Sequence, residues 1–433
     1  MVSIIIVERN EMEKLGINGR QFGIFIVTCL IAFFAPTFGA VNSTTVLMPD
    51  AFGVTPAAAS WIGTIGSITA PIAAFIAGII IGTKVSYRWS AILATFGFAL
   101  FGAFPFLYPG LSWGMLLGSR LLFGFCGGFF NTWCNSVICR MAKNESVRAT
   151  MLGINSVMFS IGASVGSMAV GALALKTWQT GYLFYAFGII ACIAAIILVR
   201  DQFIVGEEEA VEEGEEPAEK LSFGESIKSM PGVAWGFIIT FAFCTCICSG
   251  FFAYVGFAMV ESGANTLLIG TVLTMFTVAG IVAALANAGY WKALRAWTYP
   301  ITYVLFAIGY IVAIIAYHTG STALFFVSSI VIGIGCCWNG LAMTMVTSVL
   351  VIPTAVTFAF GCMEVFRNLG SFLATPWLML VGKLFGDNPN SQFMGFVIMS
   401  AVAAVITFIL AAAARKRVNA AEEEKEEAEE AAA

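Results

Sequence analysis

Twelve apolar runs, each of about 20 residues or more, dominate the sequence and alternate with short charged or Pro- and Gly-rich segments. The hydrocarbon core of a bilayer is about 30 Å thick, and an α-helix of about 20 residues crosses it with its backbone hydrogen bonds satisfied. Of the 433 residues, 59% are hydrophobic and 11% are charged, which is too apolar for a soluble domain. The chain is therefore predicted to be an all-α membrane protein with twelve transmembrane helices.

The basic residues predict the orientation of these helices. The runs cover 22–48, 56–82, 89–108, 112–138, 148–174, 178–199, 233–259, 266–289, 297–317, 320–349, 354–382 and 391–413. Threading them through a bilayer places seventeen Lys and Arg residues on one side and only Lys176 and Lys383 on the other. The positive-inside rule then puts both termini in the cytoplasm of a multi-pass protein of the plasma membrane, the inner membrane in a Gram-negative cell. Residues 1–20 lack the apolar core of a cleavable signal peptide.

One long acidic connection divides the chain into two halves of six runs each. We expect a cytoplasmic N-terminus, two six-helix bundles joined by a cytoplasmic linker, and an acidic cytoplasmic tail, with boundaries at 1–20, 21–199, 200–232, 233–413 and 414–433. A shift of 208 positions superposes the halves and pairs Gly162 with Gly370 and Asn131 with Asn339. Two parallel six-helix repeats are the arrangement of one large class of transporters.

The cysteines do not indicate disulfides or a metal. All eleven lie inside apolar runs or, for Cys139, directly after one, which is typical of small buried hydrophobic residues. Cys244, Cys246 and Cys248 are spaced i, i+2, i+4, which distributes their thiols around a helix, and the one histidine, His318, lies far along the chain. No metal or cofactor is expected. The sequence also contains no Gly-x-x-x-x-Gly-Lys-Ser/Thr loop, which argues against ATP-driven transport.

Two segments resemble signatures of the major facilitator superfamily. In the fourth run, Arg120, Gly124 and Gly127 are similar to the family pattern Arg-x-x-x-Gly-x-x-Gly. The connection after the second run resembles the signature between the second and third helices, with Gly82 where Asp is usual. The resemblance implies two pseudo-symmetric six-helix bundles around a central cavity lined by spans one, four, seven and ten. It also implies a cytoplasmic gate at Gly78, Lys84 and Arg88. The proline typical of antiporters is absent from the fifth run, which weakens an antiporter assignment.

Three charged residues lie well inside the apolar runs: Arg120, Glu364 and Arg367. Each costs about 2.5–3.5 kcal/mol at the centre of a bilayer, so each is a candidate for function. Two arginines and one glutamate leave one positive charge, which an anionic or zwitterionic substrate would offset. Glu364 is the one carboxylate within the runs and the candidate carrier of a coupling proton. In the alternative interpretation, Glu364 and Arg367 neutralise each other and brace the bundle.

Polar residues lie on one face of two equivalent spans. The stripe of span eleven is Gly361, Glu364, Asn368, Ser371 and Thr375, and that of span five is Gly153, Ser156, Ser160, Ala163 and Ser167. Further candidates for the cavity are Asn42, Asn131, Asn135, Tyr254, Trp338 and Asn339. Polar side chains also join membrane helices to one another, which is the alternative for each of these six.

These patterns predict a secondary active transporter, a symporter for a small organic anion or zwitterion, that works by alternating access. Its partners would be the substrate, a coupling proton and the lipid bilayer, with no nucleic acid, and the chain is expected to be monomeric. A multidrug-type efflux transporter is the alternative within this class. A membrane receptor or intramembrane enzyme is the alternative from another class, but the runs contain no His and no paired Asp, and no large soluble domain is evident.

Overall fold

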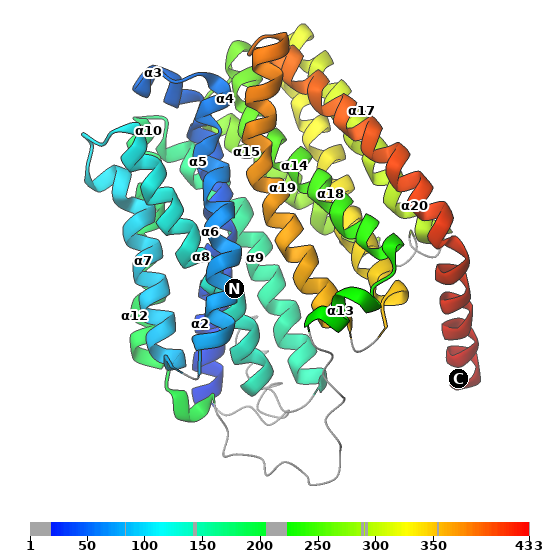
Figure 1. The fold of residues 1–433 in the computed structure, drawn as a ribbon. Helices are drawn as coiled ribbons and strands as arrows, with labels where there is room; N and C mark the ends of the chain where they lie inside the picture. Colours follow the sequence, from blue (N-terminus) through cyan, green and yellow to red (C-terminus); the bar gives the residue numbers. More distant parts are fainter. Residues whose placement is uncertain are drawn as a thin grey trace. The chain divides into compact units, whose positions relative to one another are not determined.

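The computed structural model describes residues 19–82, 84–141, 145–204, 223–286, 290, 293–352 and 355–432, and within them the chain is almost entirely helical (Figure 1). The first half comprises α2 (Gly19–Phe34), η1 (Ala35–Leu47), α3 (Met48–Phe52), α4 (Pro56–Ala59), α5 (Trp61–Thr64), η2 (Ile65–Ile68), α6 (Thr69–Ile80), α7 (Tyr87–Leu107), α8 (Trp113–Met141), α9 (Glu145–Leu173), α10 (Trp178–Gly181), α11 (Leu183–Ala186), α12 (Ile189–Leu198) and η3 (Asp201–Phe203). The second half comprises α13 (Phe223–Ser229), α14 (Gly232–Glu261), α15 (Thr266–Leu285), η4 (Arg295–Trp297), α17 (Thr298–Thr319), α18 (Thr322–Leu350), α19 (Val356–Phe385) and α20 (Pro389–Ala432).

The chain forms two compact units, which follow the two halves except for two short exchanges. The first unit contains Met1–Gly53, Ile65–Gly214 and Thr266–Thr271, and the second contains Val54–Thr64, Glu215–Asn265 and Val272–Ala433. In the first unit α8 packs against α6 and α7, and α9 packs against α2 and η1. In the second unit α17 packs against α18 and α20, and α14 packs against α19.

The helices have the length and composition that a bilayer requires. Among the described residues, eleven helical segments are long and apolar enough to cross a membrane. The polar α19, with 30 residues, is not among them and brings the number to the twelve that the sequence predicts. Many large apolar side chains are exposed, such as Ile193 and Ile197 on α12 and Val405 and Ile409 on α20. Such surfaces are unfavourable in water and are typical of a protein whose solvent is lipid.

The expected repeat is visible in two equivalent helix contacts. A Cβ atom on Gly162 of α9 would overlap the backbone of Phe33 on α2, and a Cβ atom on Gly370 of α19 would overlap the backbone of Ala242 on α14. Gly162 and Gly370 are 208 positions apart, the offset found in the sequence. In membranes, small residues of this kind let two helix backbones approach closely.

Gly370→Ala is expected to lower the apparent melting temperature of the purified protein by several degrees. The added methyl group meets a backbone carbonyl oxygen, which cannot rotate away, and overpacking of this kind costs about 1–3 kcal/mol. Gly361→Ala on the same helix is the matched control, because no atom lies within 4 Å of its Cβ position. Equal melting temperatures for the two variants would contradict the close contact.

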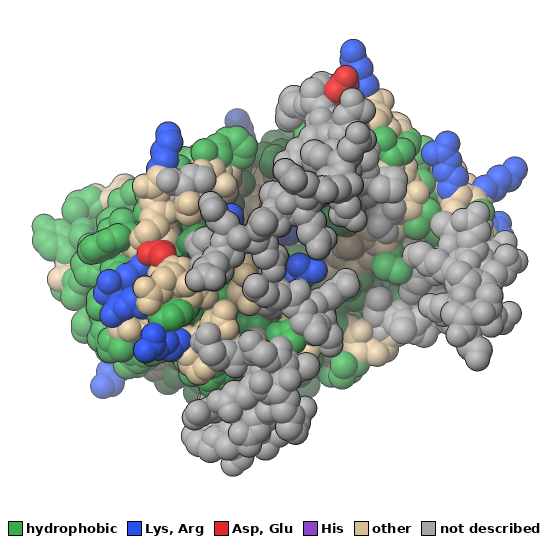
Figure 2. Space-filling model, turned by 90° about the horizontal axis from the view of Figure 1, so that it is seen from below, with side chains coloured by type: hydrophobic (Ala, Val, Ile, Leu, Met, Phe, Trp, Pro, Cys, Tyr) green, Lys and Arg blue, Asp and Glu red, His purple; other side chains and the backbone are tan. Residues whose placement is uncertain are grey.

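The two ends of the chain depart from simple straight spans. After α2 the chain continues as the 3₁₀ segment η1, where Pro36, lacking an N–H donor, stands at the start. At the other end, α20 continues past the predicted span to Ala432, although a tail is predicted from residue 414. The basic residues Arg415, Lys416 and Arg417 on this extension are exposed. Several Lys and Arg side chains lie at the surface in the view of Figure 2.

Candidate functional site

A charged triplet on α19 forms the centre of the candidate site. The Glu364 carboxylate accepts a hydrogen bond of 2.7 Å from Nε of Arg367 and another from its Nη2. Asn368 donates from Nδ2 to the same carboxylate at 3.1 Å and to the Glu364 carbonyl at 2.9 Å. The spacing i, i+3, i+4 brings these side chains onto one face of the helix.

The ion pair is accessible although it lies well inside the helix. The Arg367 and Glu364 side chains retain 44% and 48% of their exposure. They are the twelfth and ninth residues of α19, about 12–17 Å from its first residue at 1.5 Å per residue. Charged groups at such a depth are costly when they face lipid, so we infer that this face of α19 is in contact with water.

The rest of the polar stripe on α19 has a different role. Ser371 shares a hydrogen bond of 2.8 Å with Ser249 of α14. Thr375 is fully buried, and its hydroxyl lies 2.8 Å from that of Ser60 and 2.6 Å from that of Thr64. Beyond Asn368 the stripe therefore joins helices of the second unit, and the accessible part of it extends from Gly361 to Asn368.

The equivalent stripe on α9 is satisfied by its own helix. Ser156, Ser160 and Ser167 each donate to the carbonyl oxygen four residues earlier, at 2.9–3.1 Å. Such back-bonding is the usual state of a serine within a helix and gives no sign of a ligand. The polar face that the sequence predicts on span five is thus present, without the charges of its counterpart on α19.

Arg120 is enclosed by aromatic rings of the first unit. Its side chain is fully buried, and its guanidinium carbon lies 4.2 Å from the centre of the Phe123 ring, 5.4 Å from that of Tyr185 and 6.0 Å from that of Tyr182. Cation–π contacts of this kind stabilise a desolvated guanidinium. This environment gives no support to the predicted contact of Arg120 with a substrate. We therefore do not include Arg120 in the accessible charged site on α19.

Two other candidates join helices within the second unit. Asn339 is fully buried and donates a hydrogen bond of 2.7 Å to the Thr302 hydroxyl on α17. The Trp338 indole donates to the Ala283 carbonyl at 3.0 Å and stacks on the Tyr290 ring with 3.7 Å between ring centroids. These contacts agree with the alternative interpretation, in which polar residues join helices.

Tyr254 binds a carboxylate that sequence reasoning missed. Its hydroxyl donates to Asp387 at 2.7 Å, and Asp387 also accepts bonds of 3.0 Å from the Gln392 side chain and the Ala57 backbone N–H. Asp387 lies in the turn between α19 and α20, outside the apolar runs. The Pro at 389, typical of the first position of a helix, is the signal that could have marked this turn.

The remaining candidates are asparagines of the first unit. Asn42 lies on η1 and is 5% exposed, and Asn135 is exposed on α8. The side chain of Asn131 lies outside the described part of the structure. A contact of Asn42 or Asn135 with a substrate stays a prediction.

Comparison with known proteins decides the family. The model of the Major Facilitator Superfamily matches residues 22–290, which is more than half of the chain. The chain belongs to this superfamily. It is therefore a multi-pass membrane transporter and not an enzyme, as the sequence predicts. None of the curated proteins matches it in sequence.

Solved structures of transporters share the fold of this superfamily member. A bacterial homologue of the human lysosomal transporter Spinster has a TM-score of 0.76 at 15% identity, covering 93% of this chain and 99% of that one. A nucleoside transporter has a TM-score of 0.72 at 12% identity, covering 90% and 99%. A D-xylose–proton symporter has a TM-score of 0.66 at 15% identity, covering 89% and 97%. Identities this low establish the fold and leave the substrate open.

The turn between α6 and α7 has an unusual form for the superfamily signature. Gly82 adopts a φ of +77°, and a Cβ atom there would lie 2.8 Å from the Tyr87 ring, which explains why glycine replaces the usual Asp. The Asp201 carboxylate accepts the Arg88 backbone N–H at 3.1 Å, and the Arg88 guanidinium donates to the Ile196 carbonyl at 3.0 Å. Arg88 thus ties this turn to the end of α12.

The other two gate candidates make fewer contacts. Gly78 is exposed, and no atom lies within 4 Å of a Cβ placed on it, so packing does not require glycine there. Lys84 is exposed, and its backbone N–H donates to the Ile80 carbonyl at 3.0 Å. A gating role for Gly78, Lys84 and Arg88 stays a prediction.

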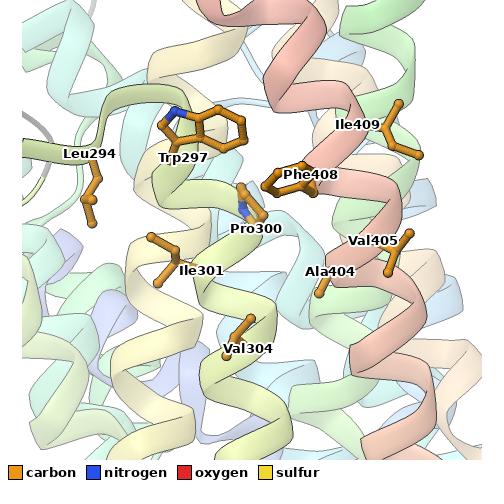
Figure 3. A pocket seen from close by; sticks show the side chains of 9 residues that line it. All are labelled: Leu294, Trp297, Pro300, Ile301, Val304, Ala404, Val405, Phe408 and Ile409. Carbon is orange, nitrogen blue, oxygen red and sulfur yellow. The ribbon is translucent and has the colours of Figure 1, made fainter.

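A large apolar groove between α17 and α20 lacks the polar groups of a solute site. It has a volume of about 590 Å³, and Figure 3 shows side chains of α17 and its preceding turn opposite those of α20. Its lining is Leu294, Trp297, Pro300, Ile301, Val304, Ala404, Val405, Phe408 and Ile409. None of the predicted site residues is among them, and specific solute sites combine an apolar lining with a few directed polar groups.

Proposed function

We propose that this chain is a secondary transporter of a small organic anion or zwitterion and that Glu364 and Arg367 contact the substrate or a coupling proton. The observation that carries the proposal is the half-exposed ion pair in the interior of a membrane-spanning helix. The hydrogen bonds described for this pair all lie within α19, so they do not join it to a neighbouring helix. Its exposure supports a role toward a solute.

The donors and acceptors of the pair match a substrate with a carboxylate. A guanidinium has five N–H donors in a planar fork, and Glu364 accepts from two of its nitrogens, Nε and Nη2. A substrate carboxylate or phosphate could take part of this fork in a bidentate arrangement. An ammonium group on the same molecule would be attracted to the carboxylate of Glu364, so the pair also suits a zwitterion.

Displacement of Glu364 from the Arg367 guanidinium by a substrate also provides a route to proton coupling. When a substrate anion draws Arg367 away from Glu364, the carboxylate loses its positive partner and binds a proton more readily. Substrate and proton would then be carried together, as in a symporter. One of the solved structures with this fold is a D-xylose–proton symporter, which gives general support to this mode.

The distribution of basic residues supports the orientation that the sequence predicts. We infer that both termini lie in the cytoplasm and that the chain resides in the plasma membrane as a monomer. Basic residues such as Arg140, Lys228 and Arg415 are exposed near the ends of α8, α13 and the spanning part of α20, on the side assigned to the cytoplasm. Labelling of cysteines introduced at the termini from either side of the membrane would test this arrangement.

A substrate panel is expected to identify carboxylates or amino acids as ligands. Purified protein would be heated with carboxylates, zwitterions, sugars and amphipathic cations, since a ligand that binds the folded state raises the melting temperature. Compounds that stabilise the protein would then be tested for uptake into proteoliposomes with and without a proton gradient. Arg367→Ala is the control and should lose the stabilisation. A strict preference for amphipathic cations would overturn the proposal and favour multidrug efflux.

A further inference from the structure

Three cysteines from two helices form a compact sulfur cluster in the second unit. Cys244 and Cys248 of α14 and Cys336 of α18 have sulfur atoms that all lie within 4.8 Å of one another. Cys244 and Cys248 are 0% and 6% exposed, and Cys336 is partly buried. The sequence predicts that the thiols of α14 are spread around the helix, but the i, i+4 pair lies on one face, and α18 packs against that helix and contributes the third.

The geometry is close to that of a trigonal metal site. A metal–sulfur bond of about 2.3 Å, the value for zinc thiolates, places three sulfurs around a trigonal ion about 4 Å apart. The three thiols are not in disulfides. Only small movements of these side chains would bring them to coordination distance.

Arg367 of α19 lies within electrostatic range of Cys336. Thiolates bring negative charge into a buried site, which is costly unless a positive group offsets it. A bound metal ion would supply part of that positive charge, since the charge of Arg367 is already paired with Glu364.

We propose that Cys244, Cys248 and Cys336 form a binding site for a soft monovalent cation, with Cu(I) as the ion that fits best. Sulfur ligands select soft ions, whereas Mg²⁺ and Ca²⁺ require oxygen ligands. Structural Zn²⁺ sites are almost always tetrahedral with four ligands, and the described cluster offers three sulfurs and neither a carboxylate nor an imidazole. Cu(I) binding would release protons from the thiols and form copper–sulfur bonds without any change of oxidation state.

Titration of the purified, reduced full-length protein with Cu(I) tests this site. The ion would be supplied without oxygen, in competition with a chromogenic Cu(I) chelator, and its environment examined by X-ray absorption. We expect one tightly bound Cu(I) per chain with sulfur neighbours, and much weaker competition from Zn²⁺. Cys336→Ser should weaken binding by more than the roughly 10–100-fold that loss of an outer-sphere partner costs.

Cys246→Ser and Cys337→Ser are the matched controls. Cys246 is 5% exposed on the same helix as Cys244 and Cys248, and Cys337 is the chain neighbour of Cys336, but neither belongs to the cluster. Both controls should retain the affinity of the unaltered protein. The proposal is overturned if Cu(I) does not bind with one-to-one stoichiometry, or if the controls lose as much affinity as Cys336→Ser. Melting temperatures without metal, together with Cys248→Ser as a second variant, separate loss of the site from loss of the fold.

Discussion

Proteoliposomes that contain the Glu364→Gln variant should lose uptake driven by a proton gradient while they retain exchange of substrate. Glutamine keeps the size of the side chain and an acceptor for the Arg367 guanidinium, but it cannot take up and release a proton. The measurement is the accumulation of labelled substrate with an inwardly directed proton gradient, alongside exchange against unlabelled substrate inside. Gradient-driven accumulation is expected to fall to the level of empty liposomes.

Glu261→Gln is the matched control for this result. Glu261 is the last residue of α14, is exposed, and accepts a hydrogen bond of 2.7 Å from the Tyr317 hydroxyl. It is therefore a carboxylate of the second unit that lies outside the proposed site. Unchanged gradient-driven uptake in Glu364→Gln, or equal losses in both variants, would exclude Glu364 as the proton carrier.

Arg367→Ala is expected to reduce substrate uptake by about 30-fold or more, because truncating one partner of a hydrogen-bonded charge pair costs about 2–5 kcal/mol and each 1.4 kcal/mol is a factor of ten. The lower part of that range applies here, since solvent screens a pair that is about half exposed. Arg367→Lys should recover only part of the activity, because an ammonium group cannot form the bidentate bond. Initial rates of uptake over a range of substrate concentrations provide the measurement.

A variant in which Glu364 and Arg367 are swapped distinguishes recognition of the substrate from stabilisation of the bundle. The double variant Glu364→Arg with Arg367→Glu keeps an ion pair at the same two positions of α19. If the pair only stabilises the bundle, this variant should transport nearly as well as the unaltered protein. If Arg367 binds the substrate, its uptake should resemble that of Arg367→Ala, and full activity would contradict the proposed site.

Hydrophobic run length predicted the fold well, because the bilayer imposes a minimum length on every span. The ion pair was also predictable, since i, i+3 spacing on one helix brings Glu364 and Arg367 together whatever lies around them. The neighbours of each polar face were not predictable. Thr375 lies on the same stripe as Glu364, yet it bonds to Ser60 and Thr64. Asn339, predicted to line the cavity, donates a hydrogen bond to Thr302.

Such differences arise from packing between helices that are distant in the chain. The pattern of one helix shows which residues share a face, but it does not show which other helix covers that face. For the same reason Cys336 could not be connected with Cys244 and Cys248 from spacing, and Asp387 could not be connected with Tyr254. Contacts of this kind need the three-dimensional structure.

The backbone contact at Gly370 has a mechanical consequence. At Gly370, α19 touches the backbone of α14 without an intervening side chain, and Ser371 bonds to Ser249 one residue further on. The two helices are therefore held together at mid-length as one rigid pair. Cys244 and Cys248 lie on α14, and Arg367 lies on α19. An ion that joined α14 to α18 would then also restrain α19, which carries the charged pair, so metal binding is expected to slow transport.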